Sequence, residues 1–451
     1  MQRSFDIAVI GGGVVGLAIL RRLCMSGLSC VLLERGADIL NGASKGNSAL
    51  LHTGFDAPTG STELACMQAG YAEYLDIRDK LNLPLVKSTA LVVAWSPEEQ
   101  AKLDGIVAKA HANGVADVRH VSREELLRLE PQLSPAAKAA VLVPGEHIID
   151  AWSAPLAYAH QALAHGAVIL RNAEVTGGDY SNGAWTLHST AGAVTARVVI
   201  NAAGNFGDLV EVIARVSPFT ITPRRGQFVV FDKEASKLVN AIILPVPTER
   251  TKGVVLFRTA YGNLAIGPTA EDVTEREVAA TDTATLERLK ARALQMVPGL
   301  DGIGVNATYA GLRPATEHKD YVIEALADRG WITVGGIRST GLTASLGIAQ
   351  HVAGLYVTHF GTLPNAPDPI WTPVPNLTEE RPRPYMEGGE IVCHCERVTR
   401  GEILAALEGA LPAGDLGGLK RRTRAMMGRC QGFNCSGHVE ALFREKTHGA
   451  A

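Results

Sequence analysis

The sequence is poor in cysteine, has no long apolar run and carries almost no net charge. Its 451 residues include only 7 cysteines, and 43 basic residues nearly balance 46 acidic ones, which gives a formal net charge of −3. That balance offers no electrostatic case for nucleic acid as a partner. No apolar run approaches the roughly 18–20 residues that cross a bilayer, so we expect no direct membrane span.

The cysteine count also bears on the compartment. Seven is an odd number, and the N-terminus MQRSFDIAVIGGG runs straight into a glycine-rich turn, unlike a secretory signal. A disulfide framework is therefore not expected, and we predict a reducing, cytoplasmic setting. What is abundant is apolar side chain, at 46%, and glycine, at 47 residues, in a chain long enough for two or three domains.

The N-terminal stretch FDIAVIGGGVVGLAILRRLCMSGLSCVLLERG predicts a dinucleotide site. An apolar strand at 7–10 leads through G-x-G-x-x-G into a buried helix at 14–23, and a second strand at 30–33 ends in Glu34. The first glycine makes the tight turn, the second lets phosphate approach, and the third packs helix on strand. The helix N-terminus favours phosphate, and Glu34 would accept hydrogen bonds from a ribose diol. That acid disfavours a 2′-phosphate, which leaves FAD or NAD.

Three further segments are rich in small residues. GASKGNSALLHTGFDAPTGS, residues 42–61, is too long and too glycine-rich for an ordinary connection. A strand at 198–200 runs into small residues at 202–204, and a strand at 331–334 leads through a glycine-rich loop into a helix at 343–355. Contacts so far apart in the sequence indicate a long, extended dinucleotide.

With these motifs the chain resembles the FAD-dependent oxidoreductases of the D-amino-acid oxidase and glycine oxidase superfamily, over roughly residues 5–365. The resemblance implies FAD rather than NAD, and an α/β fold with a Rossmann-type FAD-binding domain and an antiparallel-sheet α+β substrate domain. In that superfamily the segment GGIRSTGLTASLGIA lies against the flavin ring. The implied cofactor residues are Gly11, Gly13, Gly16, Glu34, Arg35, Ser44, Asn47, Ser48, Ala203, Gly204, Gly336, Ile337, Gly341, Leu342 and Thr343.

Two side chains on the substrate side are candidates for catalysis. Arg313 stands in a G-L-R-P turn, where relatives use an arginine to hold the anionic end of the substrate, and a planar guanidinium suits that task. A structural salt bridge is the alternative. His52 would take the proton of a substrate hydroxyl while hydride leaves carbon for the flavin; a histidine that only bonds the flavin or the loop is its alternative. Arg258 would either add a second cation or be a solvated strand residue.

The C-terminal tail differs in composition from the rest of the chain. LPNAPDPIWTPVPNLTEERPRPYMEGG, residues 363–389, has seven prolines and reads as a semi-rigid linker. Beyond it lie C-x-C, a short helix at 403–407 and C-x₄-C. Four paired cysteines fit either zinc or an iron–sulfur cluster, although C-x-C is tighter than usual zinc spacing. The basic run KRRTR at 420–424 and Arg429 would ordinarily be a solvated helix face, or would stabilise an anionic cluster nearby.

CHCERVTRGEI and KRRTRAMMGRCQGFNC resemble the bacterioferritin-associated-ferredoxin type of [2Fe–2S] domain, as found in anaerobic glycerol-3-phosphate dehydrogenase relatives. The ligands carried over are Cys393, Cys395, Cys430 and Cys435. The resemblance adds a small helical [2Fe–2S] module to the fold, and His394 between the first two ligands is left without a role. The expected domains are an FAD-binding domain (1–81, 146–215 and 326–362), a substrate domain (82–145 and 216–325), the linker (363–389) and the [2Fe–2S] module (390–451).

The combined expectation is an FAD- and [2Fe–2S]-dependent dehydrogenase of a small anionic hydroxy compound, either like glycerol 3-phosphate or a 2-hydroxy acid. Oxidation of an amino acid, imino acid or opine on the same scaffold is the first alternative, and a non-catalytic electron-transfer subunit the second. The expected partners are the anionic substrate and an electron acceptor, either a protein or a quinone-linked carrier, in an oligomer or hetero-complex. Membrane association would come through such a partner.

Overall fold

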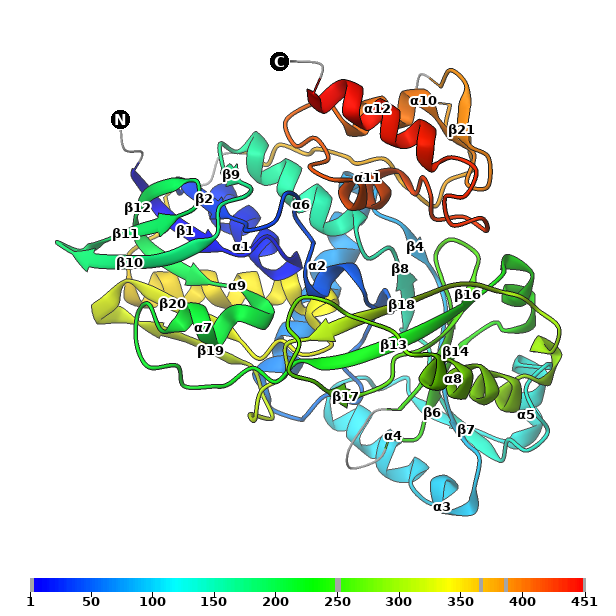
Figure 1. Cartoon of the computed structure of the whole chain (residues 1–451). Helices are drawn as coiled ribbons and strands as arrows, with labels where there is room; N and C mark the ends of the chain where they lie inside the picture. The colour runs from blue at the N-terminus through cyan, green and yellow to red at the C-terminus, as the bar shows by residue number, and fades with distance from the viewer. Residues whose placement is uncertain (1–3, 248–252, 365–367, 385–387, 449–451) are drawn as a thin grey trace.

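The computed structural model describes residues 4–247, 253–364, 368–384 and 388–448, which form two large sheets and a small C-terminal module (Figure 1). The first sheet has eight strands and the second has nine. The module, coloured orange to red in Figure 1, lies beside α6 and above both sheets. The expected fold class, a Rossmann-type domain with an antiparallel-sheet domain and a helical module, is confirmed.

The first sheet is built around parallel strands in the order β9-β2-β1-β12-β20. Along β1, Ile7 and Val9 face one core while Ala8 and Ile10 face another, and all four are buried. Burial on both faces explains why this strand reads as a continuous apolar run. The strands are β1 (Ser4–Ile10), β2 (Cys30–Leu33), β9 (Val168–Leu170), β12 (Gly192–Asn201) and β20 (Trp331–Gly335), with antiparallel β10 (Val175–Ser181), β11 (Ala184–Ser189) and β19 (Val322–Leu326) added.

Helices cover this sheet and share one core with it. Helix α1 packs on α6 and α9, and α9 packs on α2. The α2–α9 contact is close because it uses glycine: a Cβ on Gly347 would lie 2.1 Å from the carbonyl oxygen of Cys66. These helices are α1 (Val14–Met25), α2 (Thr62–Leu81), α6 (Ser153–Ala164) and α9 (Gly341–His359), with short α7 (Gly207–Glu211) after β12.

The second sheet is largely antiparallel and carries its own core. As expected, the segments RRGQFVVFD and GVVLFRTAYGNLAIGPT form strands, and the second turns back at Tyr261. Its strands are β5 (Ala90–Ala94), β6 (Arg119–Val121), β7 (Ala139–Val143), β13 (Arg224–Phe231), β14 (Ile242–Pro245), β15 (Val255–Arg258), β16 (Leu264–Gly267), β17 (Glu271–Asp272) and β18 (Val305–Arg313). Its helices are α3 (Pro97–Gln100), α4 (Leu103–Ala112), α5 (Arg123–Leu129) and α8 (Thr283–Met296).

A three-stranded sheet lies between the two large ones and has consequences for the site. It consists of β3 (Leu50–Leu51), β8 (His147–Ile149) and β4 (Leu85–Val86). Antiparallel pairing sets Leu51 opposite His147. One step further along this register brings position 52 opposite position 146, although 94 residues separate them in the sequence.

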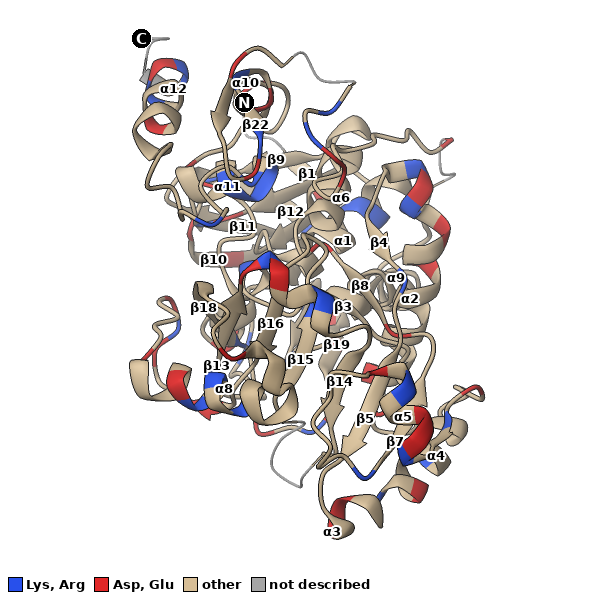
Figure 2. Ribbon diagram, turned by 90° about the vertical axis from the view of Figure 1, so that its right-hand side faces the viewer, with Lys and Arg blue, Asp and Glu red and all other residues tan. Residues whose placement is uncertain are grey.

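The module is small and packs against the domain that contains the first sheet. It contains β21 (Ile391–Cys393), β22 (Val398–Thr399), α10 (Arg400–Ala406), α11 (Leu416–Thr423) and α12 (Ser436–His448). A capping box between Thr399 and Glu402 starts α10 where the chain leaves its two-stranded hairpin. α11 is the helix of the module nearest the parallel sheet, and its basic stretch is visible in blue in Figure 2.

The interpretation of the basic run as a solvated helix face is wrong for α11. Arg422 forms a bidentate ion pair with the buried carboxylate of Asp38, with N–O distances of 2.6 and 2.9 Å. Arg421 is buried and donates to the carbonyl of Ile39 at 3.0 Å. The run therefore binds the module to the loop after β2, because a buried carboxylate there needs cationic partners.

Candidate functional site

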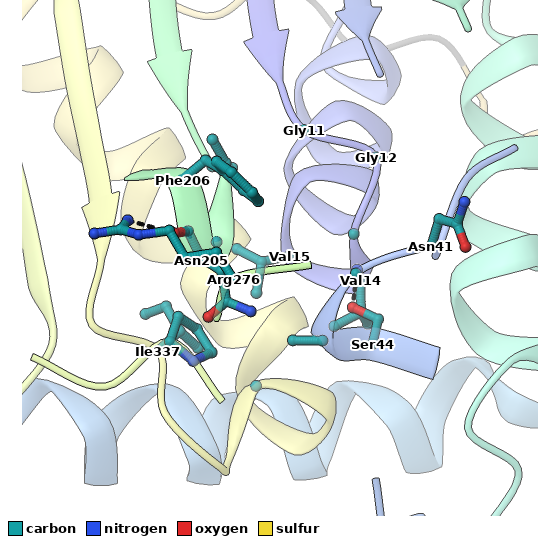
Figure 3. A pocket seen from close by; sticks show the side chains of 18 of the residues that line it. Gly11, Gly12, Val14, Val15, Asn41, Ser44, Asn205, Phe206, Arg276 and Ile337 are labelled. Atoms are coloured by element: carbon teal, nitrogen blue, oxygen red, sulfur yellow. Dashed lines mark hydrogen bonds between the residues drawn. The ribbon is translucent and has the colours of Figure 1, made fainter. Parts of the chain in front are cut away.

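A cavity of about 560 Å³ opens where the carboxyl ends of β1, β2, β12 and β20 meet the ends of β13 and β18 from the second sheet. Figure 3 shows Ser44 and Asn41 on one side of this main cavity and Asn205, Phe206 and Arg276 on the other. Ligands of parallel α/β sheets bind at this carboxyl edge. Apart from Gly16 and Thr343, every residue expected to hold the cofactor lines the cavity.

The glycine turn after β1 is shaped for close approach. Gly11 has a φ of +110°, and a Cβ there would lie 2.5 Å from the carbonyl oxygen of Ala202. Gly16 does not line the cavity: a Cβ on it would lie 2.0 Å from the carbonyl oxygen of Gly11, so it lets α1 pack on the turn. The backbone N–H of Val14, at the start of α1, donates to the Ser44 hydroxyl at 3.0 Å, as drawn in Figure 3.

Glu34 stands at the end of β2, facing this turn. Its two carboxylate oxygens accept from the backbone N–H groups of Gly12 and Gly36, both at 2.7 Å. Each oxygen keeps a second lone pair for a ribose hydroxyl. Together with the helix N-terminus and the glycine cradle, this donor and acceptor set fits a dinucleotide with a free ribose diol.

The start of α9 closes the inner end of the cavity. Gly336 has a φ of +68°, and Ile337, Gly341 and Leu342 line the wall, so the first N–H groups of α9 lie next to the space. Thr343 does not line the cavity. Its hydroxyl donates to the carbonyl of Leu50 at 3.2 Å and accepts the backbone N–H of His52 at 3.1 Å, which fixes α9 against β3.

The loop that follows β17 of the second sheet covers the outer end of the cavity. No pattern in the sequence predicts this contact. Arg276 forms a bidentate pair with Asp208 at 2.6 and 2.9 Å and also donates to the carbonyl of Asn205 at 2.7 Å. Burial alone would raise the pKa of Asp208, but the hydrogen bonds from Arg276 and from backbone N–H groups lower it overall. Arg35 lies 3.8 Å from the ring centre of Phe206 and pairs with Glu277 of the same loop.

Arg313 lies at the end of β18, on the substrate side of the cavity. Its guanidinium donates to the backbone carbonyls of Thr269 at 2.5 Å and of Arg224 and Arg225 at 3.3 and 3.4 Å. Among the described residues no carboxylate lies within ion-pair distance of it, so the alternative of a structural salt bridge finds no support there. Burial, followed by the neighbouring Arg224, lowers the pKa of Arg313 to about 10, which leaves it cationic at neutral pH. A half-buried cation in a cavity wall suits an anionic ligand.

His52 follows β3 and meets a buried acid. Its Nδ1 lies 2.6 Å from Oε2 of Glu146, whose side chain is only 1% exposed. The other oxygen of Glu146 accepts from the backbone N–H and the hydroxyl of Thr53, at 2.7 and 2.8 Å. With Glu146 accepting at Nδ1, the lone pair of the neutral imidazole is on Nε2, the form that a general base requires. The sequence did not predict a role for Glu146, because no motif near it indicates a contact with His52.

Arg258 does not supply the second cation considered for the main cavity. Its Nη2 donates to the carbonyl of Asn240 at 2.9 Å. Burial raises the pKa of Glu130, and the positive charge of Arg258 partly offsets that rise. The Arg258 side chain does not belong to the wall of the main cavity. Arg258 is half-buried: its Nε is buried, whereas the bond from Nη2 to Asn240 lies at the surface.

The four tail cysteines approach one another as two pairs. The thiols of Cys395 and Cys430 interact directly, as do those of Cys393 and Cys435. Backbone N–H groups of the turn, led by that of Asn434, lower the pKa of Cys430, whereas burial and then Cys393 raise the pKa of Cys435 to about 11. Within the described ranges no three ligating side chains gather around a single point. Two pairs of thiols are the donor set of a cluster with two iron atoms, each bound by two cysteines.

The module also touches the second domain, next to these cysteines. The Arg424 guanidinium lies 3.4 Å from the ring centre of Tyr261, and its Nε donates to Glu396 at 3.0 Å. Tyr261 in turn stacks on Trp152, and its hydroxyl donates to Asp150. The indole N–H of Trp152 donates to the carbonyl of Lys45, a residue of the main cavity, at 3.4 Å. A continuous series of contacts thus joins the cavity wall to the residue after Cys395.

Two family profiles match this chain and divide it at the linker. The profile of the FAD dependent oxidoreductases matches residues 6–355, and that of the BFD-like [2Fe-2S] binding domain matches residues 391–445. These matches agree with the donor sets of the main cavity and of the paired cysteines, so FAD and a [2Fe–2S] cluster are the cofactors. Within the described ranges, no helix is both long and apolar enough to cross a bilayer.

Individual relatives resemble this chain over most of its length. A glycerol 3-phosphate dehydrogenase of Caloramator mitchellensis is 31% identical over 98% of this chain and 94% of its own length. One component of an anaerobic glycerol-3-phosphate dehydrogenase of Escherichia coli is 26% identical over 98% of this chain and 88% of its own. The solved structure of a dithionite-reduced L-alpha-glycerophosphate oxidase of Mycoplasma pneumoniae with FAD bound has 27% identity and a TM-score of 0.75, covering 82% of this chain and 98% of that one.

Proposed function

Because the chain belongs to the FAD-dependent oxidoreductase family, we propose that it is a dehydrogenase of a small anionic hydroxy compound, glycerol 3-phosphate first of all, which passes electrons on through its module. The observation that carries this proposal is the His52–Glu146 pair, with Nδ1 and Oε2 at 2.6 Å. Alcohol oxidation requires a base for the hydroxyl proton, whereas oxidation of a neutral amine does not. The names of the full-length relatives support the same substrate.

Each described side chain has a distinct task in this reaction. Arg313, in the wall of the main cavity, binds the anionic end of the substrate. His52 is not among the residues that line this cavity; it follows β3, and Glu146 holds its ring so that the hydroxyl proton moves onto Nε2. When bound, FAD would supply the hydride acceptor and the [2Fe–2S] cluster a carrier of single electrons. The sheet that ends in β13 and β18 covers the substrate side and limits the access of water.

Two other functions remain as alternatives. An amino-acid, imino-acid or opine dehydrogenase would use Arg313 for the carboxylate but would have no need of a base at His52. A non-catalytic electron-transfer subunit would need neither residue. A 2-hydroxy acid is the second substrate class of the main proposal, because Arg313 suits a carboxylate as well as a phosphate.

Anaerobic mixing of the purified protein with candidate substrates tests the proposal. Glycerol 3-phosphate, a set of 2-hydroxy acids and a set of amino acids are each added, while flavin absorbance and the electron paramagnetic resonance (EPR) signal of the reduced cluster are followed. We expect glycerol 3-phosphate to bleach the flavin and then to produce the cluster signal. Bleaching by amino acids alone would contradict the hydroxyl assignment, and no bleaching by any compound would favour the non-catalytic role.

A further inference from the structure

The cluster site is asymmetric with respect to solvent. Cys393 and Cys435 are buried, whereas Cys395 and Cys430 are partly exposed. The partly exposed pair is held by two turns, residues 393–399 and 427–438. An electron leaves such a centre most readily at its exposed edge, so these two turns decide which acceptor can come near.

Both turns present cationic and apolar groups to solvent. Phe433 is 89% exposed, the side chain of Arg429 is 79% exposed, and His394 and Arg397 are also exposed. Phe433 lies between two cluster ligands in the sequence, and exposed aromatic rings next to arginines have the composition that is enriched where protein surfaces bind partners. We call Phe433, His394, Arg397 and Arg429, with exposed Gln431 and Asn434, the acceptor face.

Carboxylates are almost missing from this face. Glu396 is the one acid in the two turns; its side chain is 7% exposed, and it pairs with Arg424 and Lys233. The nearby Asp232 pairs with Arg429 at 2.9 Å. The 3-10 helix η3 (Lys233–Leu238) follows Asp232 directly, and its exposed charges are two lysines, Lys233 and Lys237, and one acid, Glu234. The face therefore stays cationic although the whole chain has a net charge of −3.

We propose that the acceptor face docks an acidic protein that carries one electron at a time. This rests on the proposed function in one respect, namely that reduced flavin supplies the electrons. At each encounter the reduced cluster loses one electron and the carrier gains one, so two carriers dock in turn for each substrate oxidised, and the two protons pass to solvent. Electrostatic attraction speeds such encounters, and a central exposed aromatic ring anchors a small, short-lived interface.

The test uses electrons that do not come from a substrate. The holoprotein is reduced with dithionite, the excess is removed, and it is mixed with oxidised cytochrome b5, an acidic haem protein, or with cytochrome c, a basic one. We expect the bimolecular rate with cytochrome b5 to fall by about tenfold or more from low salt to about 1 M salt, where screening acts within about 3 Å. The rate with cytochrome c should stay flat or rise, because repulsion is screened.

Substitutions test whether the docking site coincides with the acceptor face. Phe433→Ser and Arg397→Glu should each slow reduction of cytochrome b5 by about tenfold, with an unchanged cluster EPR signal per flavin and unchanged turnover with a dye acceptor. Arg444→Glu is the matched control, since Arg444 is 70% exposed and lies two turns along α12 from its start at Ser436. It makes the same charge change away from the face and should leave the rate as in the wild type.

Three outcomes of the measurements with cytochrome b5 would overturn the proposal. They are a cytochrome b5 rate that is indifferent to salt, face variants that match the wild type, or an Arg444→Glu effect as large as that of Arg397→Glu. Rapid reoxidation by a quinone in lipid vesicles, equal in wild type and Phe433→Ser and without any reaction of cytochrome b5, would assign the acceptor to a membrane quinone instead. Failure of glycerol 3-phosphate to reduce the flavin would affect the proposed function alone, because dithionite supplies the electrons here.

Discussion

The Nδ1 atom of His52 lies 2.6 Å from Oε2 of Glu146, and the carboxylate is almost entirely withdrawn from water. A buried acid is stable only with donors around it, and the described part of the chain gives it three: His52, and the backbone N–H and hydroxyl of Thr53. The pair couples a residue of the cofactor-binding segment to the turn between β7 and β8. It orients the ring and selects its tautomer at the same time.

Replacing His52 and Glu146 separately should divide base catalysis from positioning. His52→Ala should lower kcat by about 10²–10⁴-fold, the range lost with a general base. Glu146→Gln, which removes the negative charge beside Nδ1, should lower kcat less than His52→Ala does and leave KM close to that of wild type. Thr53→Val, which removes one hydrogen bond to the same acid, is the control and should lower kcat least. A Glu146→Gln protein with the kcat of wild type would reduce Glu146 to a structural residue.

Arg313 should act on substrate binding. Arg313→Met should raise KM by about 10²-fold or more, since loss of one partner of a buried charged pair costs about 2–5 kcal/mol, and Arg313→Lys should recover part of it. A guanidinium is cationic below its pKa, and burial sets that of Arg313 at about 10. KM for an anionic substrate should therefore be flat through neutral pH and rise as the pH approaches 10. Steady-state kinetics with a dye acceptor measures both, with Arg258→Met as a cation control outside the cavity.

The pair between Asp208 and Arg276 should retain FAD in acid. The pKa of Asp208 is lowered from 3.8, so the contribution of the pair is complete above that pH and is lost as the pH falls through the lowered value. Asp208→Asn should release flavin at a higher pH than wild type does, which flavin fluorescence detects directly. Asp6→Asn removes another carboxyl with a lowered pKa, far from the cavity, and should not change release. Equal release in all three proteins would mean that the loop does not hold the cofactor.

The Asp38–Arg422 pair should be the main electrostatic contact that binds the module. Removing one partner of a buried ion pair costs about 3–5 kcal/mol. Asp38→Asn should therefore separate unfolding of the module from that of the FAD-binding domain, giving two calorimetric transitions where we expect one for the wild type. Arg444→Met breaks an exposed pair with Glu440 and should change stability by less than about 1 kcal/mol. A single unshifted transition for Asp38→Asn would show that other contacts suffice.

Elements defined by local pattern were predictable, whereas pairings across the fold were not. The strands at 7–10 and 30–33 and the helix from Val14 follow from apolar runs and glycine spacing, both readable within a short window. Glu146 and Arg276 have no such window, because their partners lie 94 and 68 residues away. The basic run was misread for the same reason: the acid that buries Arg422 is 384 positions earlier in the chain.

The loop after β2 serves two tasks within a few residues. Glu34 faces the main cavity, while Asp38 and the carbonyl of Ile39 bind α11 of the module. Directly after Ile39, the N–H of Leu40 donates to the carbonyl of Gly12 at 2.9 Å, so the loop and the glycine turn move together. Ordering by cofactor and ordering by the module are therefore reciprocal: each should strengthen the other by the same factor. During folding in the cell, binding of FAD should therefore order the surface that the C-terminal module contacts. In a chain without FAD, we expect the [2Fe–2S] module to bind the FAD-binding domain less tightly.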